Sequence, residues 1–273
     1  MAAANNLPAE VAHPRSGCTL RLVLHRHGDA ATNFDCEGCK ESGEGTRYTS
    51  VNNPRVHLHT HCALATRTLQ HQLVRGDMEL RLIAPTGRDA VLCDACYGAV
   101  RGFHYHSSTS SLDLHPGCAN MPVSITLKEG GSGTTFELRT KVKHRCSSCR
   151  EMEGYYRPWC YRSTNFDKRV YLHIKCIKEI MASCRRGDGE ARQTHHEIVA
   201  AGSSRGAGFG IGEEDDTRVI ARLQERAGGS SKLVTRICKV LVIFMRVVIG
   251  VLFGDPTALL VAGVNLMPAL LNQ

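Results

Sequence analysis

One pattern of cysteine and histidine residues occurs three times along the chain and limits what it can fold into. In each copy a Cys-x-x-Cys pair is followed by a His-x-x-Cys pair, and 19, 18 and 23 residues separate the two pairs in turn. The first set is Cys36, Cys39, His59 and Cys62, the second is Cys93, Cys96, His115 and Cys118, and the third is Cys146, Cys149, His173 and Cys176.

Each set offers three thiolates and one imidazole, which is a closed tetrahedral ligand set for structural zinc. A single Cys-x-x-Cys pair would be a weak signal, because buried cysteines also serve as small apolar side chains. Three matched sets favour metal and predict about three zinc ions per chain. A Cys-x-x-Cys pair can also carry thioredoxin-type redox chemistry, usually without a partner His-x-x-Cys pair, so a protein-disulfide reductase is the alternative.

The repeat divides the 273 residues into small units. Modules of about fifty residues bury too little apolar surface to be stable alone and usually need a metal or disulfide staple. The N-terminal stretch from Met1 to Pro14 has no apolar run of signal-peptide length. We therefore expect an intracellular protein, in the cytoplasm or nucleus, whose reduced cysteines are free to bind metal.

The expected fold class is small zinc-stabilised α+β modules, with short β-strands and little helix, in three tandem copies. The modules are placed at residues 13–66, 71–121 and 135–184, with Gly130 to Gly133 as a flexible break. Short alternations of apolar and polar residues predict strands. These strands are residues 20–24, 80–82 and 136–138 before the Cys-x-x-Cys pairs, and 56–58, 112–114 and 170–172 before the His-x-x-Cys pairs. A helix is predicted from Ile174 to Ser183.

The C-terminal third has a different composition. Residues 185–215 are rich in Arg, Gly, Ser and acidic residues and are predicted to be a disordered linker. Residues 232–273 are predicted to form amphipathic or hydrophobic helices. Four basic residues fall on one face of the first helix, which suits an anionic membrane surface, a partner groove, or packing within the chain or in a homo-oligomer. The basic residues are Lys232, Arg236, Lys239 and Arg246.

The positive charge is concentrated in the third module. Residues 139–186 hold 13 Lys and Arg against 4 Asp and Glu, whereas the whole chain has a net charge of +8. A basic face suits phospholipid, phosphorylated protein or nucleic acid, although it can equally be a solvated surface. Aromatic and basic side chains alternate in this module. The alternation suits stacking on the bases of single-stranded nucleic acid, or a structural cluster beside the metal. These side chains are Tyr155, Tyr156, Arg157, Trp159, Tyr161 and Arg162.

The second module carries a family resemblance. Its stretch from Gly102 to Ala119, with Tyr105 and then Leu112-Asp-Leu-His115-Pro-Gly-Cys118, resembles the cysteine/histidine-rich divergent C1 domains abundant in plants. These domains are relatives of the diacylglycerol-binding zinc domains of protein kinases. The first and third modules end in similar stretches, Val56-His-Leu-His59-Thr-His-Cys62-Ala and Tyr171-Leu-His173-Ile-Lys-Cys176. The resemblance covers roughly residues 13–184.

The resemblance implies a fold with two interleaved zinc ions in each module. In each module the first ion would use the four Cys and His residues of that copy of the repeat. The family's second Cys-x-x-Cys falls on Ser107 and Ser110, and the first module also lacks it, so the second ion is lost there. Cys160 and Cys184 leave a second zinc in the third module open, and Cys18 falls at the family's N-terminal histidine. Diacylglycerol binding does not carry over, because it depends on a groove that both metals hold.

The sequence thus predicts a non-enzymatic zinc-binding interaction protein, in plant intracellular signalling or stress response, with unknown protein partners. The alternatives are the disulfide reductase and nucleic-acid binding through the third module. No catalytic role is assigned to His195-His196-Glu197, which lacks the spacing of a zinc protease helix. Six further histidines flank strands and are expected at the surface: His25, His27, His57, His61, His104 and His106.

Overall fold

The structure is a computed structural model. It describes residues 7–25, 33–74, 79–84, 91–129, 132–141, 144–151, 158–164 and 169–185, and residues 241, 243, 244, 247 and 248 near the C-terminus. The predicted linker at residues 185–215 lies outside this part, apart from its first residue. Most of the predicted helical segment at residues 232–273 lies outside it as well.

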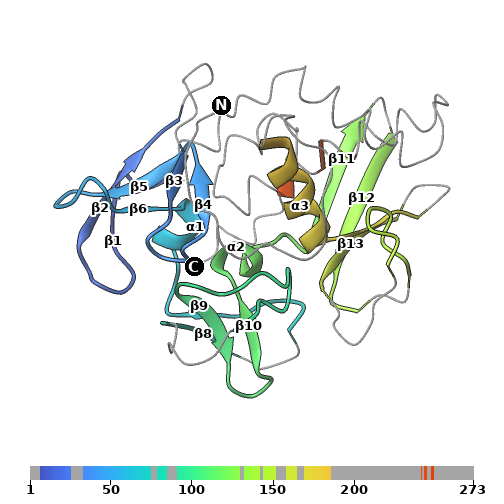
Figure 1. Ribbon diagram of the computed structural model, residues 1–273, viewed down its shortest axis with the longest axis horizontal. Helices are drawn as coiled ribbons and strands as arrows, with labels where there is room; N and C mark the ends of the chain where they lie inside the picture. Colours follow the sequence, from blue (N-terminus) through green and yellow to red (C-terminus); the bar gives the residue numbers. More distant parts are fainter. Residues whose placement is uncertain are drawn as a thin grey trace.

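The described chain forms three four-stranded antiparallel sheets, one for each copy of the repeat (Figure 1). Module 1 contains β1 (Glu10–Ala12), β2 (Thr19–Val23), β5 (Arg47–Ser50) and β6 (His57–Leu58), with a separate hairpin of β3 (Asn33–Asp35) and β4 (Ser42–Glu44). Module 2 contains β7 (Thr68–Leu69), β8 (Leu80–Ile83), β9 (His104–Ser107) and β10 (Leu112–Leu114). Module 3 contains β11 (Ser124–Glu129), β12 (Ser132–Arg139), β13 (Cys160–Ser163) and β14 (Tyr171–His173).

A helix follows the last strand of each sheet. These helices are α1 (Thr60–Ala63), α2 (Pro116–Ala119) and α3 (Ile174–Arg185). The structure therefore confirms the expected class in its coarse form, since it is mostly short strands with little helix around tandem Cys and His clusters. The six strands predicted from apolar alternation and the helix predicted from Ile174 are also present.

The first strand of each sheet lies upstream of the range in which the sequence placed each module. The strands β1, β7 and β11 begin at Glu10, Thr68 and Ser124, before the predicted starts at residues 13, 71 and 135. These edge strands pair with β2, β8 and β12 respectively. Each module thus includes an N-terminal hairpin that the cysteine pattern does not mark.

The predicted flexible break at Gly130 to Gly133 is wrong. Strands β11 and β12 pair across it, with Glu129 opposite Ser132 and Ile125 opposite Phe136. Two glycines between alternating segments are typical of a two-residue hairpin turn, because such turns need positive φ values. Residues 130 and 131 themselves lie outside the described part of the chain. The register buries Ile125 and Phe136 on one face, which fixes the pairing.

A buried tyrosine closes each module in the same way. The hydroxyl of Tyr48 donates a hydrogen bond to the carbonyl of Pro8, 40 residues earlier, at 2.7 Å. The matching bonds run from Tyr105 to the carbonyl of Thr66 at 3.1 Å and from Tyr161 to that of Pro122 at 2.7 Å. A buried phenol needs such a partner. The bond fastens the entry of each module to its third strand, so it marks where each module begins.

Modules 1 and 2 meet at a close backbone contact. The ring of Phe103 is 4% exposed and belongs to the apolar cluster of module 1, although the residue comes from module 2. Its backbone amide donates a hydrogen bond to the carbonyl of Gly38 at 2.9 Å. A Cβ atom on Gly102 would lie 2.1 Å from the Gly38 oxygen and 2.6 Å from the Cys39 Cα. Only glycine therefore permits this approach without a shift of backbone.

Module 3 contacts module 2 through Trp159. Its backbone amide donates to the carbonyl of Ala95 at 3.0 Å, within the Cys-x-x-Cys turn of module 2. Its ring lies against His71, with ring centroids 5.0 Å apart, and is 3% exposed. The modules therefore pack on one another and are not independent domains.

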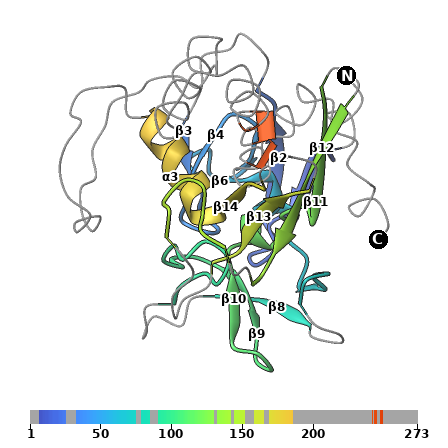
Figure 2. The same ribbon diagram turned by 90° about the vertical axis from the view of Figure 1, so that its right-hand side faces the viewer.

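The described tail residues pack against module 3. Leu241, Phe244, Val247 and Val248 have helical spacing and are buried in the cluster that includes Ile125, Leu138 and Tyr161. The Phe244 ring stacks on Phe136, with centroids 4.0 Å apart, and meets the Tyr161 ring edge-on at 4.9 Å. This segment lies between α3 and the β11–β12 hairpin in Figures 1 and 2. Of the roles considered for the tail, packing within the chain fits these residues.

Candidate metal centres

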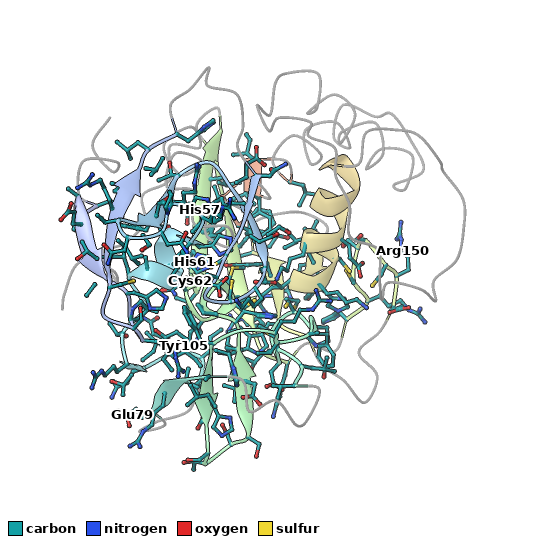
Figure 3. The ribbon with its side chains drawn as sticks, turned by 60° about the vertical axis from the view of Figure 1, so that its left-hand side comes forward. His57, His61, Cys62, Glu79, Tyr105 and Arg150 are labelled. Atoms are coloured by element: carbon teal, nitrogen blue, oxygen red, sulfur yellow. The ribbon has the colours of Figure 1, made fainter. Side chains whose placement is uncertain are left out.

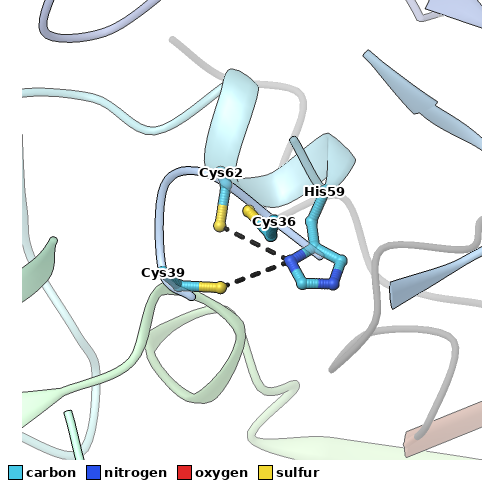
Figure 4. Close-up of side chains that lie close together, drawn as sticks. All are labelled: Cys36, Cys39, His59 and Cys62. Atoms are coloured by element: carbon cyan, nitrogen blue, oxygen red, sulfur yellow. Dashed lines mark hydrogen bonds between the residues drawn. The ribbon is translucent and has the colours of Figure 1, made fainter. Parts of the chain in front are cut away.

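The structure brings the twelve predicted ligands together in the three predicted sets. Within each set one ligand atom from every residue lies within 4.8 Å of the others. Figure 4 shows module 1, where the Nδ1 atom of His59 lies 3.4 Å from the Cys39 sulfur and 3.8 Å from the Cys62 sulfur. Cys36 completes the set. All four residues are at most 1% exposed.

The other two sets have the same geometry. The His115 Nδ1 atom lies 3.4 Å from the Cys96 sulfur, and the His173 Nδ1 atom lies 3.5 Å from Cys149 and 3.8 Å from Cys176. A zinc ion with bonds of about 2.3 Å to sulfur and about 2.0 Å to nitrogen would need edges of about 3.8 Å between sulfurs and about 3.5 Å from sulfur to nitrogen. The observed separations fit these edges, so each set can hold a tetrahedral zinc ion.

Local backbone structure explains how each Cys-x-x-Cys pair presents two sulfurs to one point. In module 1 the amide of Lys40 donates to the carbonyl of Cys36 at 2.8 Å, and Lys40 adopts a φ of 61°. The amide of Cys36 donates to Glu41, and that of Glu37 donates to the carbonyl of His57. The last of these bonds ties the turn to β6, the strand that leads into His59.

The same three bonds recur in the other modules at equivalent positions. In module 2 they join Tyr97 to Cys93, Cys93 to Gly98, and Asp94 to Asp113; in module 3 they join Arg150 to Cys146, Cys146 to Glu151, and Ser147 to Tyr171. Tyr97 and Arg150 have φ values of 59° and 63°. A left-handed residue directly after the second cysteine therefore belongs to the site geometry. Sequence reasoning missed it, because none of the three is a glycine.

Each histidine ligand sits at the junction of a strand and a helix. His59 and His115 have φ of −55° and ψ near 150°, so the chain turns from extended to helical directly after the ring. The next ligand, the third residue of the helix, then returns to the same point. The Nε2 atom of His115 lies 3.1 Å from the carbonyl of Ala99 and donates to it when Nδ1 faces the thiolates. Such an outer bond fixes the ring orientation and tautomer that metal binding requires.

The thiol pKa values within a cluster are shifted in opposite directions. Hydrogen bonds from Cys118 and Cys93 hold the pKa of Cys96 well below its usual value. A hydrogen bond from Cys176 likewise lowers the pKa of Cys146 to about 3.

The neighbouring thiols shift the other way, because a hydrogen bond to Cys93 raises the pKa of Cys118 well above its usual value. Without a cation, therefore, each cluster stabilises one thiolate at the expense of its neighbours. A divalent metal ion is the group that lets all three ionise.

No second cluster forms among the described residues. The Cys160 sulfur belongs to a small apolar cluster with Tyr171 rather than to a ligand set, and the Cys184 side chain lies outside the described part. Two residues after the buried tyrosine of modules 1 and 3, serine hydroxyls accept hydrogen bonds from the backbone, whereas the Ser107 hydroxyl of module 2 is buried without a hydrogen-bond partner among the described residues. Ser50 accepts from the amide of Asn53 at 3.3 Å, and Ser163 accepts from that of Val170 at 2.8 Å.

Two expectations about surface residues are wrong. Both ring nitrogens of His61 are buried, and its ring stacks on His59 with centroids 4.8 Å apart, beside Cys62 in the interior of the molecule (Figure 3). His104 is 2% exposed and lies 3.2 Å from the Asp113 carboxylate. His61 lies in α1 and His104 begins β9, and a pattern along one segment of chain cannot show what packs against either ring.

The aromatic stretch proposed for nucleic-acid stacking is also largely unavailable. Trp159 and Tyr161 are 3% and 0% exposed, so neither can stack on a base. Arg162 forms an ion pair with Glu137 at 2.7 Å. Tyr155, Tyr156 and Arg157 lie outside the described residues. The structural cluster, which was the other interpretation, therefore fits the described residues.

Comparison with known proteins gave no match. No family model, no curated protein and no solved structure matches the chain. The resemblance to divergent C1 domains therefore stays an interpretation of residues in the three modules.

Proposed function

We propose that the protein is a non-enzymatic zinc-binding scaffold whose three packed modules present an interaction surface. The observation that carries the proposal is that all three sets are closed. Each supplies three sulfurs and one nitrogen around one centre, which leaves no position for a substrate or water. Closed sites of this kind stabilise folds, whereas catalytic zinc sites keep one position open. Zinc is the metal that such a set of soft sulfur and imidazole ligands favours.

The packing of the cysteines supports a structural role over disulfide reduction. The Cys-x-x-Cys pairs lie in turns that follow loops or short strands, and eight of the nine ligand cysteines are buried. A redox cysteine has to be reached by its substrate, and thioredoxin-type pairs usually open a helix. We extend the proposal to plant intracellular signalling or stress response, in the cytoplasm or nucleus, on the resemblance to divergent C1 domains alone.

An anionic group on a partner protein is the chemistry that the described surface suits. A shallow groove of about 480 Å³ lies between modules 1 and 2 and is lined by Arg15, Arg67 and Arg81, with Leu82 at its side. Arg81 also pairs with Glu79 at 3.0 Å. Arginine pairs with carboxylates and phosphates through parallel hydrogen bonds. No helix among the described residues is long and apolar enough to cross a membrane.

Metal and thiol counting tests the proposal. The chain has 13 cysteines, of which nine are proposed ligands, so four are left over. Protein purified under reducing conditions should contain about three zinc ions, and at most four thiols should react with a small alkylating reagent. Excess chelator should release the zinc and expose nine more thiols.

A Cys18→Ser variant should keep all the zinc, whereas Cys93→Ser should lose one ion per chain. Protein with no zinc and with reducible disulfides would instead favour the reductase. Full zinc content in Cys93→Ser would show that the assigned set is wrong.

A further inference from the structure

Three modules meet at one partly buried ion pair. The Lys178 ammonium of α3 lies 2.6 Å from the Glu41 carboxylate of module 1 and 3.7 Å from the Cys96 sulfur of module 2. The Lys178 and Glu41 side chains are 18% and 23% exposed. The same carboxylate oxygen lies 3.9 Å from the Nε2 atom of His115.

The charges at this junction depend on the metal. A zinc ion with three thiolates and a neutral imidazole carries a net charge of about −1. The four ligands of module 2 are at most 2% exposed, so this charge is buried. A buried charge is stable only when it is paired or hydrogen-bonded. Lys178 supplies the cation beside Cys96, and Glu41 holds the ammonium in place.

The position of Lys178 depends on module 3. The helix α3 begins at Ile174, directly after His173, and contains Cys176 in its first turn. Two of the four proposed ligands of module 3 therefore fix the start of the helix that carries Lys178. Metal in module 3 would hold this turn in place, since metal binding and local folding are linked.

We propose that Lys178 is a positioning residue that couples the metal sites: zinc in module 3 orders α3, and α3 places an ammonium against the Cys96 thiolate, which strengthens zinc binding in module 2. This inference rests on the proposed zinc occupancy. It replaces the view of modules that bind metal independently, which the tandem repeat alone suggests. Partners of metal ligands typically change metal affinity about 10–100-fold when they are removed.

The test compares Lys178→Met with Lys175→Met in the full chain. Lys175 lies one turn earlier on the same helix and pairs with Glu179 at 3.7 Å, where both side chains are more than half exposed. Zinc release to a chromogenic chelator is followed, and the cysteines freed at each time are alkylated and assigned by mass spectrometry. Lys178→Met should weaken zinc binding in module 2 about tenfold or more, and binding in module 3 should weaken with it because the coupling is reciprocal, while module 1 and the Lys175→Met control match the wild type.

Three results would overturn the inference. Equal release from module 2 in the two lysine variants would show that the ammonium does not matter. Equal acceleration at all three sites would show general unfolding instead of a local effect. A third variant, His173→Ala, should weaken module 2 as Lys178→Met does, and the double variant should be no weaker there than either single one. Additive losses of zinc affinity at module 2 would show that Lys178 does not act together with the metal of module 3.

Different results would contradict the proposed function and this inference. Wild-type protein without zinc would remove the proposed function, and the coupling with it. Wild-type protein with three zinc ions and an unaffected Lys178→Met variant would remove the coupling alone.

Discussion

Gly102→Ala should separate modules 1 and 2 by a clash with the backbone of Gly38 and Cys39, although it replaces no metal ligand. The added Cβ would lie 2.1 Å from the Gly38 oxygen, 2.5 Å from the Cys39 carbonyl carbon and 2.6 Å from the Cys39 Cα. All three are backbone atoms, so no side-chain rotation can relieve the contact. The φ of Gly102 is not in the left-handed region, so the steric clash is the whole effect.

The size of the effect follows from what the contact holds together. If the backbones part, the Phe103 ring loses its place in the module 1 cluster, where it is 4% exposed. Full burial of a phenylalanine contributes about 1.5–3 kcal/mol, and the Phe103 to Gly38 hydrogen bond contributes about 1 kcal/mol. We expect a loss of about 2–4 kcal/mol in the free energy of unfolding. In a domain of this size that lowers the melting temperature by on the order of 10 °C.

Thermal unfolding of the zinc-loaded protein measures this loss. Gly133→Ala is the matched control, because its nearest neighbour would be the Thr126 methyl group at 3.5 Å, an ordinary contact. Zinc content should be unchanged in both variants at 20 °C. A Gly102→Ala melting temperature equal to that of Gly133→Ala would refute the close contact between modules 1 and 2.

Three further predictions concern other contacts. Burial lowers the pKa of His71 to about 4, so its neutral ring against Trp159 contributes stability above pH 6.5 that is lost as the pH falls towards 4. Denaturant titrations should therefore show a larger loss between pH 7 and 5 in the wild type than in His71→Gln. Phe244→Ala, which removes the stack on Phe136, should speed tryptic cleavage of the tail by several-fold, and an unchanged rate would contradict the packing. Deletion of residues 232–273 should abolish any salt-sensitive binding to anionic vesicles, whereas equal binding would point to module 3.

The ligand sets could be predicted from the sequence because each depends on local spacing. A Cys-x-x-Cys turn and a strand-to-helix junction at His59 or His115 are both short-range structures, and their residue types are specific to metal. The flanking strands could be predicted for the same reason, since their apolar residues alternate. The match between three copies then strengthened every assignment within one copy.

The third strand of each sheet could not be predicted in this way. In β9, for example, His104 and Ser107 are buried beside Tyr105, so polar residues occupy interior positions. A pattern of apolar alternation fails where buried polar groups are satisfied by neighbours, as His104 is by the Asp113 carboxylate. The repeated tyrosine was the missing signal, because it recurs 10 to 12 residues before each ligand histidine.

Contacts between modules could not be predicted from the sequence. Lys178 and Glu41 are 137 residues apart, and nothing near either residue marks the other. The apolar tail showed that Phe244 needs a partner, but its spacing fits a membrane, another chain or module 3 equally well. Only the three-dimensional arrangement selects the Phe136 and Tyr161 face.

The junction also explains why three small modules occur in one chain. A module of about fifty residues has little apolar surface to bury, so a bound zinc ion would supply much of its folding energy. A buried zinc site with three thiolates adds a charge that such a module has few groups to balance. Packing solves both problems at once, since Phe103 extends the core of module 1 and Lys178 brings a cation to module 2. On this basis metal loss from module 3 should loosen module 2, because α3 would no longer hold Lys178 against the Cys96 sulfur.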